Sequence, residues 1–319
     1  AVGENADAQT DNATAIGNES IANGIDALAV GDTAMAMGNS TSAIGGESVA
    51  TGPGASAFGW QALATAERAT AVGHLATAQG VRSVAIGENA DAQTDNATAI
   101  GNESIANGID ALAVGDTAMA MGNSTSAVGG ESVATGPGAS AFGWQAQANA
   151  ERSTALGHLA TSDGFASVAV GEAAAAQGRG GIAIGGNTYG GAFGALATDD
   201  AGIALGGDAE ARGVGAISIG SDGDGDGDGS VADGVDALAL GADATAMGNS
   251  PSAIGGESVA TGPGASAFGW QSSAGAERAT ALGHLATAQG VRSVAIGENA
   301  DAQTDFSTAI GNEAIANGV

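Results

Sequence analysis

Apolar and polar positions recur along the chain with a period of fourteen residues. The clearest marker is the tripeptide Ala-aliphatic-Gly, whose glycine returns every 14 residues from Gly3 to Gly185. The spacing widens to 21 between Gly185 and Gly206, returns to 14 at Gly220, and widens to 21 again between Gly220 and Gly241. From Gly241 to Gly311 it is 14 throughout. The chain therefore contains 22 units and two seven-residue insertions. Such a short, regular period predicts a solenoid, in which each unit packs only on its neighbours.

Each unit has a recurring internal pattern. If the alanine of the tripeptide is position one, position two is aliphatic or Phe, position three is Gly, and positions six and eight are commonly Ala or Ser. Position ten is usually Gly, and position fourteen is often Val, Leu or Thr. The alternation at positions fourteen, one and two predicts one short strand, and positions six to eight predict another. The two glycines predict tight corners, because glycine tolerates a positive φ.

Two short strands and two corners form one flattened coil, and successive coils stack about 4.8 Å apart. The fold class is therefore all-β: a parallel β-roll of 14-residue coils. A helix is not favoured, because the units lack a 3.6-residue apolar stripe. Glycine also returns about every seven residues and would destabilise a helix interior by about 1 kcal/mol each time.

The pattern leaves two ways to assign the faces of each strand. We expect the larger side chains of position two to point inward, opposite positions six and eight. The near-invariant alanine of position one would then point outward as a strip covered by partner chains. Hydrophobic residues make up 44% of the chain, and most of them are alanine. A thin alanine core buries little area at about 25 cal/mol per Å², so we expect a homo-oligomer.

The repeat also describes the domain organisation. We expect a single β-roll over residues 1–319, with insertions near 186–205 and 221–234. Residues 1–84 recur almost unchanged as 85–168, and residues 239–319 match 29–109. Both ends of the chain fall inside the repeat, so we interpret it as a fragment of a longer protein. We predict no signal peptide at its start, and no apolar run approaches the ~20 residues of a membrane span.

Charge and cysteine content limit the possible partners. The chain has 35 acidic residues and 7 basic residues, all of them Arg, for a formal net charge of −28. Such a chain would be repelled by a phosphate backbone, so we predict no nucleic-acid partner, and an anionic membrane surface is an equally poor one. The acidity otherwise indicates solubility and repulsion between molecules. Cysteine is absent, which excludes disulfides and thiolate metal sites.

The predicted strand at positions fourteen, one and two, with its flanking residues, carries a family resemblance. The stretches Ser83-Val84-Ala85-Ile86-Gly87 and 167–171 (Ser-Val-Ala-Val-Gly) resemble the head repeat of YadA-like trimeric autotransporter adhesins. The resemblance implies a left-handed β-roll, a homotrimer, and display at the cell surface on the outer membrane of a Gram-negative bacterium. It also implies binding to host matrix proteins or cell-surface receptors. Membrane attachment would depend only on the family's C-terminal anchor, which these 319 residues do not contain.

Aromatic residues recur at position four. Each of three histidines lies one unit after a tryptophan at the same position, so each pair should stack about 5 Å apart. The pairs are Trp60 and His74, Trp144 and His158, and Trp270 and His284. We interpret them as structural stacks, with a functional aromatic contact patch as the alternative. Ligands at a zinc-like spacing are lacking. We assign no catalytic, cofactor-binding or metal-binding residue.

Arginines and glutamates lie close together at one corner of the unit. Position twelve carries Arg68 and Arg82 in adjacent units, and likewise Arg278 and Arg292. A glutamate immediately precedes an arginine at Glu67, Glu151 and Glu277. We interpret these pairs as local charge compensation on an acidic surface. A patch that binds an anion or a sulfated ligand is the alternative.

The two insertions carry the least regular sequence. The stretch from Asp222 to Gly229 alternates Asp and Gly, including Asp228, and its carboxylates could bind calcium. It lacks the ligand order of an EF-hand, so we interpret it as a solvated loop with an ion site as the alternative. The first insertion begins Gly186-Asn187-Thr188-Tyr189, and Phe193 is nearby. It is either a binding loop or a plain excursion from the coil.

Three classes of function compete. We predict an adhesin head, a trimeric surface that attaches to host matrix or cells. An ice-binding solenoid is the alternative, because Thr recurs at position fourteen (Thr14, Thr70, Thr98, Thr154, Thr280 and Thr308). Val, Leu and Ser interrupt that array. An enzyme is not expected: the period does not suit a hexapeptide acyltransferase, and the sequence lacks obvious pocket-forming loops.

Overall fold

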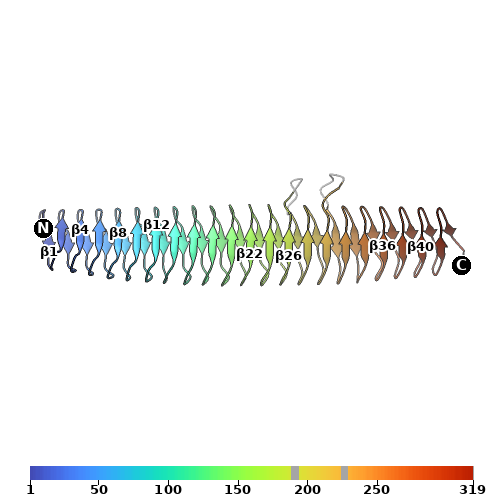
Figure 1. Ribbon diagram of the computed structural model, residues 1–319, viewed down its shortest axis with the longest axis horizontal. Helices are drawn as coiled ribbons and strands as arrows, with labels where there is room; N and C mark the ends of the chain where they lie inside the picture. The colour runs from blue at the N-terminus through green and yellow to red at the C-terminus, as the bar shows by residue number, and fades with distance from the viewer. Residues whose placement is uncertain (188–193, 224–228, 319) are drawn as a thin grey trace. The chain divides into compact units, whose positions relative to one another are not determined.

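The computed structural model describes residues 1–187, 194–223 and 229–318. It comprises two compact units, Ala1–Arg152 and Ser153–Val319. Each unit is a parallel β-solenoid in which the chain alternates between two sheets (Figure 1). Among the described residues there are 43 strands and no helix. This confirms the predicted all-β fold.

The first sheet is built from positions fourteen, one and two of each coil. In the first unit its strands are β2 (Thr14–Ile16), β4 (Leu28–Val30), β6 (Ser42–Ile44), β8 (Ser56–Phe58), β10 (Thr70–Val72), β12 (Val84–Ile86), β14 (Thr98–Ile100), β16 (Leu112–Val114), β18 (Ser126–Val128) and β20 (Ser140–Phe142). In the second unit they are β22 (Thr154–Leu156), β24 (Val168–Val170), β26 (Ile182–Ile184), β28 (Ile203–Leu205), β30 (Ile217–Ile219), β32 (Leu238–Leu240), β34 (Ser252–Ile254), β36 (Ser266–Phe268), β38 (Thr280–Leu282), β40 (Val294–Ile296) and β42 (Thr308–Ile310).

The second sheet is built from positions seven and eight, with position nine added in two strands. In the first unit its strands are β1 (Asp7–Ala8), β3 (Ile21–Ala22), β5 (Met35–Ala36), β7 (Val49–Ala50), β9 (Leu63–Ala64), β11 (Thr77–Ala78), β13 (Asp91–Ala92), β15 (Ile105–Ala106), β17 (Met119–Ala120), β19 (Val133–Ala134) and β21 (Gln147–Ala148). In the second unit they are β23 (Thr161–Ser162), β25 (Ala175–Ala176), β27 (Leu196–Ala197), β29 (Glu210–Ala211), β31 (Val231–Asp233), β33 (Thr245–Met247), β35 (Val259–Ala260), β37 (Ser273–Ala274), β39 (Thr287–Ala288), β41 (Asp301–Ala302) and β43 (Ile315–Ala316).

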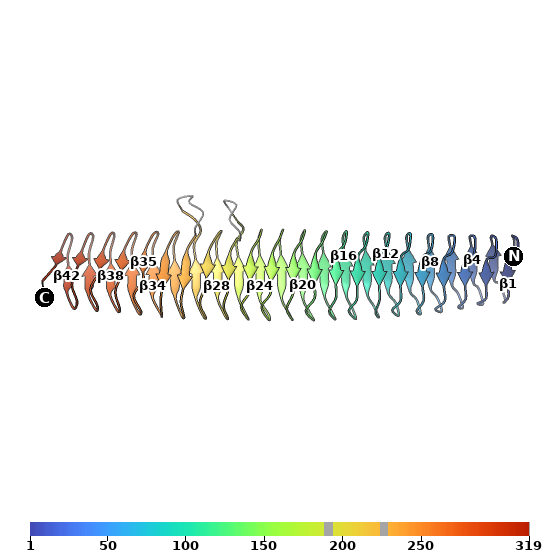
Figure 2. The ribbon, with the colours of Figure 1, turned by 180° about the vertical axis from the view of Figure 1, so that it is seen from behind.

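Within each unit the strands pair in parallel and in register (Figure 2). Ala71 lies beside Ala85, and Val72 beside Ile86, one 14-residue period further along the chain. Across the first insertion the offset becomes 21, and Ala183 lies beside Ala204. Equivalent positions of successive coils therefore form straight columns, which confirms the predicted stacking of 14-residue coils.

The interior of the coil is lined by small side chains. Ala85 at position one is completely buried, and so are residues at positions six, eight and thirteen such as Ala90, Ala92 and Ala97. Position two points outward instead, and Ile86 is 39% exposed. The prediction that position two fills the interior while position one faces outward is therefore wrong. The two sheets lie so close together that the largest fully buried side chains are Thr and Pro (Thr41, Thr125 and Pro251).

The two glycine corners differ in their physical basis. Position three has the positive φ that the sequence predicts, for example +133° at Gly17. At position ten, however, Gly24 lies outside the left-handed region, and the positive φ of that corner belongs to position twelve, as at Asp26 (φ 59°). Glycine is favoured at position ten because a Cβ on Gly24 would collide with the carbonyl group of Gly38 in the next coil. The predicted turn is correct, but its cause at position ten is close backbone approach.

Both insertions occur at the same corner of the coil. Residues 186–194 lie between Gly185 at position three and Ala195 at position six, where an ordinary coil has two residues. Residues 221–229 occupy the same place in the later coil. The pairing returns to register at Leu196 and at Val231. The extra residues thus lie inside the predicted ranges 186–205 and 221–234, before the strands that begin at Leu196 and Val231.

Candidate binding surface

The outward face of the first sheet is uncharged, with apolar side chains at position two and with Ser, Thr or aliphatic side chains at position fourteen. Position two carries Val, Ile, Leu or Phe in every coil, and in the structure these side chains are half-buried or exposed. Ile100 is exposed to 36% and Leu282 to 46%. None of the described first-sheet strands contains a charged residue. We call this set of position-two side chains the apolar column. Within each of the two compact units, an exposed apolar surface of this kind is typical of a protein–protein interface.

The outward face of the second sheet is mixed. Its position-seven side chains include Ile21, Met35 and Val49, all of them half-buried. Polar pairs between positions seven and nine, one of them an ion pair, interrupt this face. Gln93 Nε2 donates to Asp91 Oδ2 at 2.6 Å, and Glu210 forms an ion pair with Arg212. The two sheets therefore present chemically different surfaces to their surroundings.

Tryptophan, histidine and glutamate form a column at position four. The rings of Trp60 and His74 are stacked, with centroids 4.9 Å apart and an interplanar angle of 15°. Trp270 and His284 stack in the same way at 5.0 Å, so the stacking prediction is confirmed for these two pairs. Trp144 lies in the first compact unit and His158 in the second, and the stacking of that pair stays a prediction.

A glutamate one coil further along extends this column. His74 Nδ1 lies 3.2 Å from Glu88 Oε1, and the equivalent contacts at Glu172 (with His158) and Glu298 (with His284) are 3.3 Å. Sequence reasoning missed this partner, although its signal was present: the glutamate follows the histidine by one period at the same position.

The tryptophan has limited freedom to act as a contact platform. One face of Trp60 is covered by His74, and its Cδ1 lies only 3.2 Å from where a Cβ on Gly46 would be. The indole is 47% exposed. In the later copy, Trp270 Nε1 also donates to Glu257 Oε1 at 3.2 Å. These contacts favour the structural interpretation of the stacks, since ring faces rather than ring edges bind planar or sugar ligands.

The arginines at position twelve contact neighbouring side chains. Arg68 Nε lies 3.7 Å from Glu67 Oε1, and Arg278 Nε lies 3.8 Å from Glu277 Oε1. Arg152 makes the equivalent contact with Glu151 at 3.6 Å. These exposed pairs fit local charge compensation and contribute about 0–1 kcal/mol each.

Contacts between arginines and aromatic rings were not predicted. The guanidinium of Arg292 lies over the ring of Phe306, 5.9 Å from its centroid, in the adjacent coil. Cation–π pairs of this kind stabilise exposed sites by about 0.5–1 kcal/mol. The structure thus places Arg292 against a neighbour in its own chain. Arg82 lies beside Arg68 in the next coil, and the anion-patch alternative for this pair stays a prediction.

The structure describes only the ends of the two insertions. At the second insertion, Gly223 N donates to the Asp243 carboxylate at 3.0 and 3.1 Å. The middle of each insertion lies outside the described residues, including Thr188, Tyr189, Phe193, Asp224, Asp226 and Asp228. The calcium-site and aromatic-loop alternatives therefore stay predictions. In the part of the chain that the structure describes, no three His, Asp or Glu side chains are grouped to hold a metal ion.

Comparison with known families gives one match. The model of the YadA head domain repeat (two copies) matches residues 1–20, 36–62, 50–76, 64–90, 78–104, 95–116, 113–139, 134–160, 162–188, 197–222, 226–250, 252–272, 260–286, 274–300 and 288–314. These segments overlap and together include most of the 319 residues. No curated protein matches the chain. Over the described ranges, no helix is long and apolar enough to cross a membrane.

Proposed function

The chain belongs to the YadA head domain family of the trimeric autotransporter adhesins, and from that premise we propose that it forms a homotrimer at the surface of a Gram-negative bacterium and attaches to host matrix proteins or host-cell receptors. Its role in this proposal is to present a binding surface rather than to catalyse a reaction.

The apolar column is the observation that carries the proposal. A fully buried alanine removes little apolar area from water, and among the described residues the largest fully buried side chains are Thr and Pro. The larger aliphatic side chains lie outside, on the first sheet. In a homotrimer, the first sheets of three chains would face one another and bury this column. The association would then supply apolar burial that a single chain lacks.

This arrangement assigns the host-facing surface by elimination. If the first sheet faces the other two chains, the second sheet and the two corners face outward. These outward parts carry the polar pairs of positions seven and nine, the Trp–His–Glu columns and both insertions. A polar rim beside an apolar interface is the usual arrangement in protein assemblies. We propose that host molecules contact the corners and the second sheet.

Binding of the soluble chain to immobilised matrix proteins, glycans and cultured cells tests the adhesive role. The intact chain should bind at least one of these surfaces saturably. Two matched variants lack residues 186–194 or 221–229, each segment being replaced by Gly-Glu, the two residues that follow Gly45 at an ordinary corner. A loss confined to one variant would place the contact at that insertion. Absence of binding to every surface by a folded chain would contradict the adhesive role.

The ice-binding alternative is not favoured. In the structure, the Thr residues of position fourteen share their column with Leu28, Val84 and Ile182, so the outward face lacks a regular hydroxyl array. We expect thermal hysteresis of the chain in cold solution to be negligible.

A further inference from the structure

One coil departs from the alanine rule inside the solenoid. Position one is alanine in 21 of the 22 units, and the exception is Ser218 in β30. Ser218 is completely buried. A hydroxyl in an apolar interior is destabilising unless it is hydrogen-bonded, and Ser218 is hydrogen-bonded. The second insertion begins two residues later, directly after Gly220.

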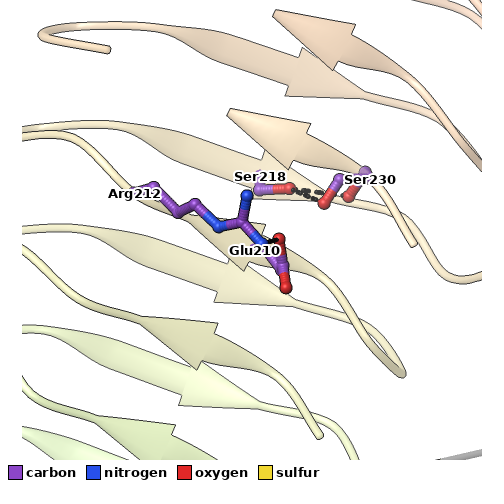
Figure 3. A network of polar contacts seen from close by, with 4 residues as sticks. All are labelled: Glu210, Arg212, Ser218 and Ser230. Atoms are coloured by element: carbon purple, nitrogen blue, oxygen red, sulfur yellow. Dashed lines mark hydrogen bonds and ion pairs between the residues drawn. The ribbon is translucent and has the colours of Figure 1, made fainter. Parts of the chain in front are cut away.

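The partner of Ser218 is the residue at which the insertion rejoins the coil. Ser218 Oγ lies 2.7 Å from both the carbonyl oxygen and the Oγ of Ser230 (Figure 3). Ser230 is also buried, and its Oγ donates to the Gly220 carbonyl oxygen at 3.1 Å. With two hydroxyl protons available, a series of hydrogen bonds runs from Ser218 through Ser230 to Gly220. These hydrogen bonds join the two ends of the insertion inside the core.

Several ordinary corners that have serine at position six make the same bond from the serine hydroxyl to the corner glycine carbonyl. The hydroxyl of Ser48 donates to the Gly45 carbonyl oxygen at 2.8 Å, and that of Ser272 donates to Gly269 at 2.9 Å, each across three residues. Between Ser230 and Gly220 the same bond spans ten residues. The second insertion therefore leaves the coil without changing the hydrogen bond that closes an ordinary corner.

The complete serine relay also exists at a corner without an insertion. Ser162 Oγ lies 2.6 Å from Ser167 Oγ, which donates to the Gly164 carbonyl oxygen at 2.7 Å. Both serines are buried. The arrangement of two hydroxyls and a corner carbonyl is thus a recurring way of closing a corner of this core.

The first insertion lacks these hydroxyls. Its coil has Ala183 at position one and Ala195 at position six, both completely buried. Its two ends are joined by a backbone bond, from Ala195 N to the Gly185 carbonyl oxygen at 3.1 Å. The two insertions have the same length and the same place in the coil, but only the coil of the second carries the serine pair.

We propose that Ser218 is a positioning residue, which acts with Ser230 as a buried clamp that fixes where the second insertion leaves and rejoins the coil. The bond from Gly223 N to Asp243 holds the outgoing end at a further point, on the next coil. The insertion would be presented to a partner from a fixed base, whereas the base of the first insertion depends on its backbone bonds.

Hydrogen–deuterium exchange of the full chain carrying Ser218→Ala tests the clamp. Alanine is the residue of every other unit at this position, so the variant should fold and melt like the parent chain. Loss of about one net hydrogen bond should speed exchange about fivefold at the amides of residues 220–223 and 229–231, with other coils unaffected. Ser162→Ala is the matched control, and it should change exchange only near Gly164. Unchanged exchange at the insertion base in Ser218→Ala, or faster exchange spread evenly over all coils, would overturn the proposal.

Discussion

The outward faces of the two sheets differ although the same short repeat builds both. The first sheet exposes an uninterrupted apolar column, and its described strands lack charge. The second sheet alternates apolar residues with pairs such as Asp91–Gln93 and Glu210–Arg212. A surface that stays in water tolerates charged side chains, whereas burying an unpaired charge against other chains is strongly destabilising. In the proposed homotrimer, the outward face of the first sheet would be the interface between subunits and that of the second sheet would not.

A charge placed in the apolar column should have the largest effect. Leu282→Glu would bury an unpaired carboxylate at the proposed interface, three times in a trimer, at several kcal/mol for each. We expect the trimer to dissociate or the chain to lose its fold, as measured by size-exclusion chromatography and circular dichroism. Ser273→Glu is on the outward face of the second sheet, in the coil before that of Leu282, and should leave both signals unchanged. Equal behaviour of the two variants would remove the distinction between the faces.

Enlarging an interior side chain should have the next largest effect. Ala85→Leu adds three carbon atoms to a position that is completely buried between closely spaced sheets. Overpacking of this kind destabilises by about 1–3 kcal/mol or more, so the melting temperature should fall. Thr77 points outward on the second sheet, so Thr77→Leu should change the melting temperature little. If Ala85→Leu were tolerated as well as Thr77→Leu, position one could not be the interior position.

Removal of a polar interruption should have a smaller effect of the opposite sign. Asp91 Oδ1 is buried without a hydrogen-bond partner. Asp91→Leu removes that desolvated oxygen and should raise the melting temperature by an amount equivalent to about 0.5–2 kcal/mol. The second sheet would also become more apolar, so light scattering should increase with protein concentration. A lower melting temperature would show that the carboxylate stabilises the sheet.

The smallest effect is expected at the corner arginines. Arg68→Gln removes an exposed pair with Glu67, in which Nε and Oε1 are 3.7 Å apart. The free energy of unfolding should change by less than about 1 kcal/mol, and binding to host surfaces should persist. Selective loss of binding to sulfated glycans would instead support the anion-patch alternative.

Much of the fold could be predicted from the spacing of residues, and the orientation of the strands could not. The period, the strand positions and the corners follow from glycine and from alternation, which are local properties. Alternation also shows that Ala85 and Ile86 point in opposite directions, but it does not say which one points inward. Side-chain size suggested Ile86, because large apolar residues normally fill a core. Here the space between the sheets admits only small residues, and the large ones lie on the outside.

The site was predictable where its residues share a column and unpredictable where the chain breaks its period. Trp60 and His74 could be paired from their 14-residue separation, and Glu88 could have been added by the same rule. Ser218 stood out as an exception to the alanine rule. Its partner, Ser230, is separated from it by the insertion, so the regular spacing did not indicate the contact.

Sedimentation equilibrium of the soluble chain tests the central claim most directly. If the apolar column is the interface between subunits, the measured mass should be three times the 29.8 kDa of one chain, and it should stay so on dilution to low micromolar concentration. A folded chain with the mass of a monomer under these conditions would leave the column exposed to water and would contradict the account.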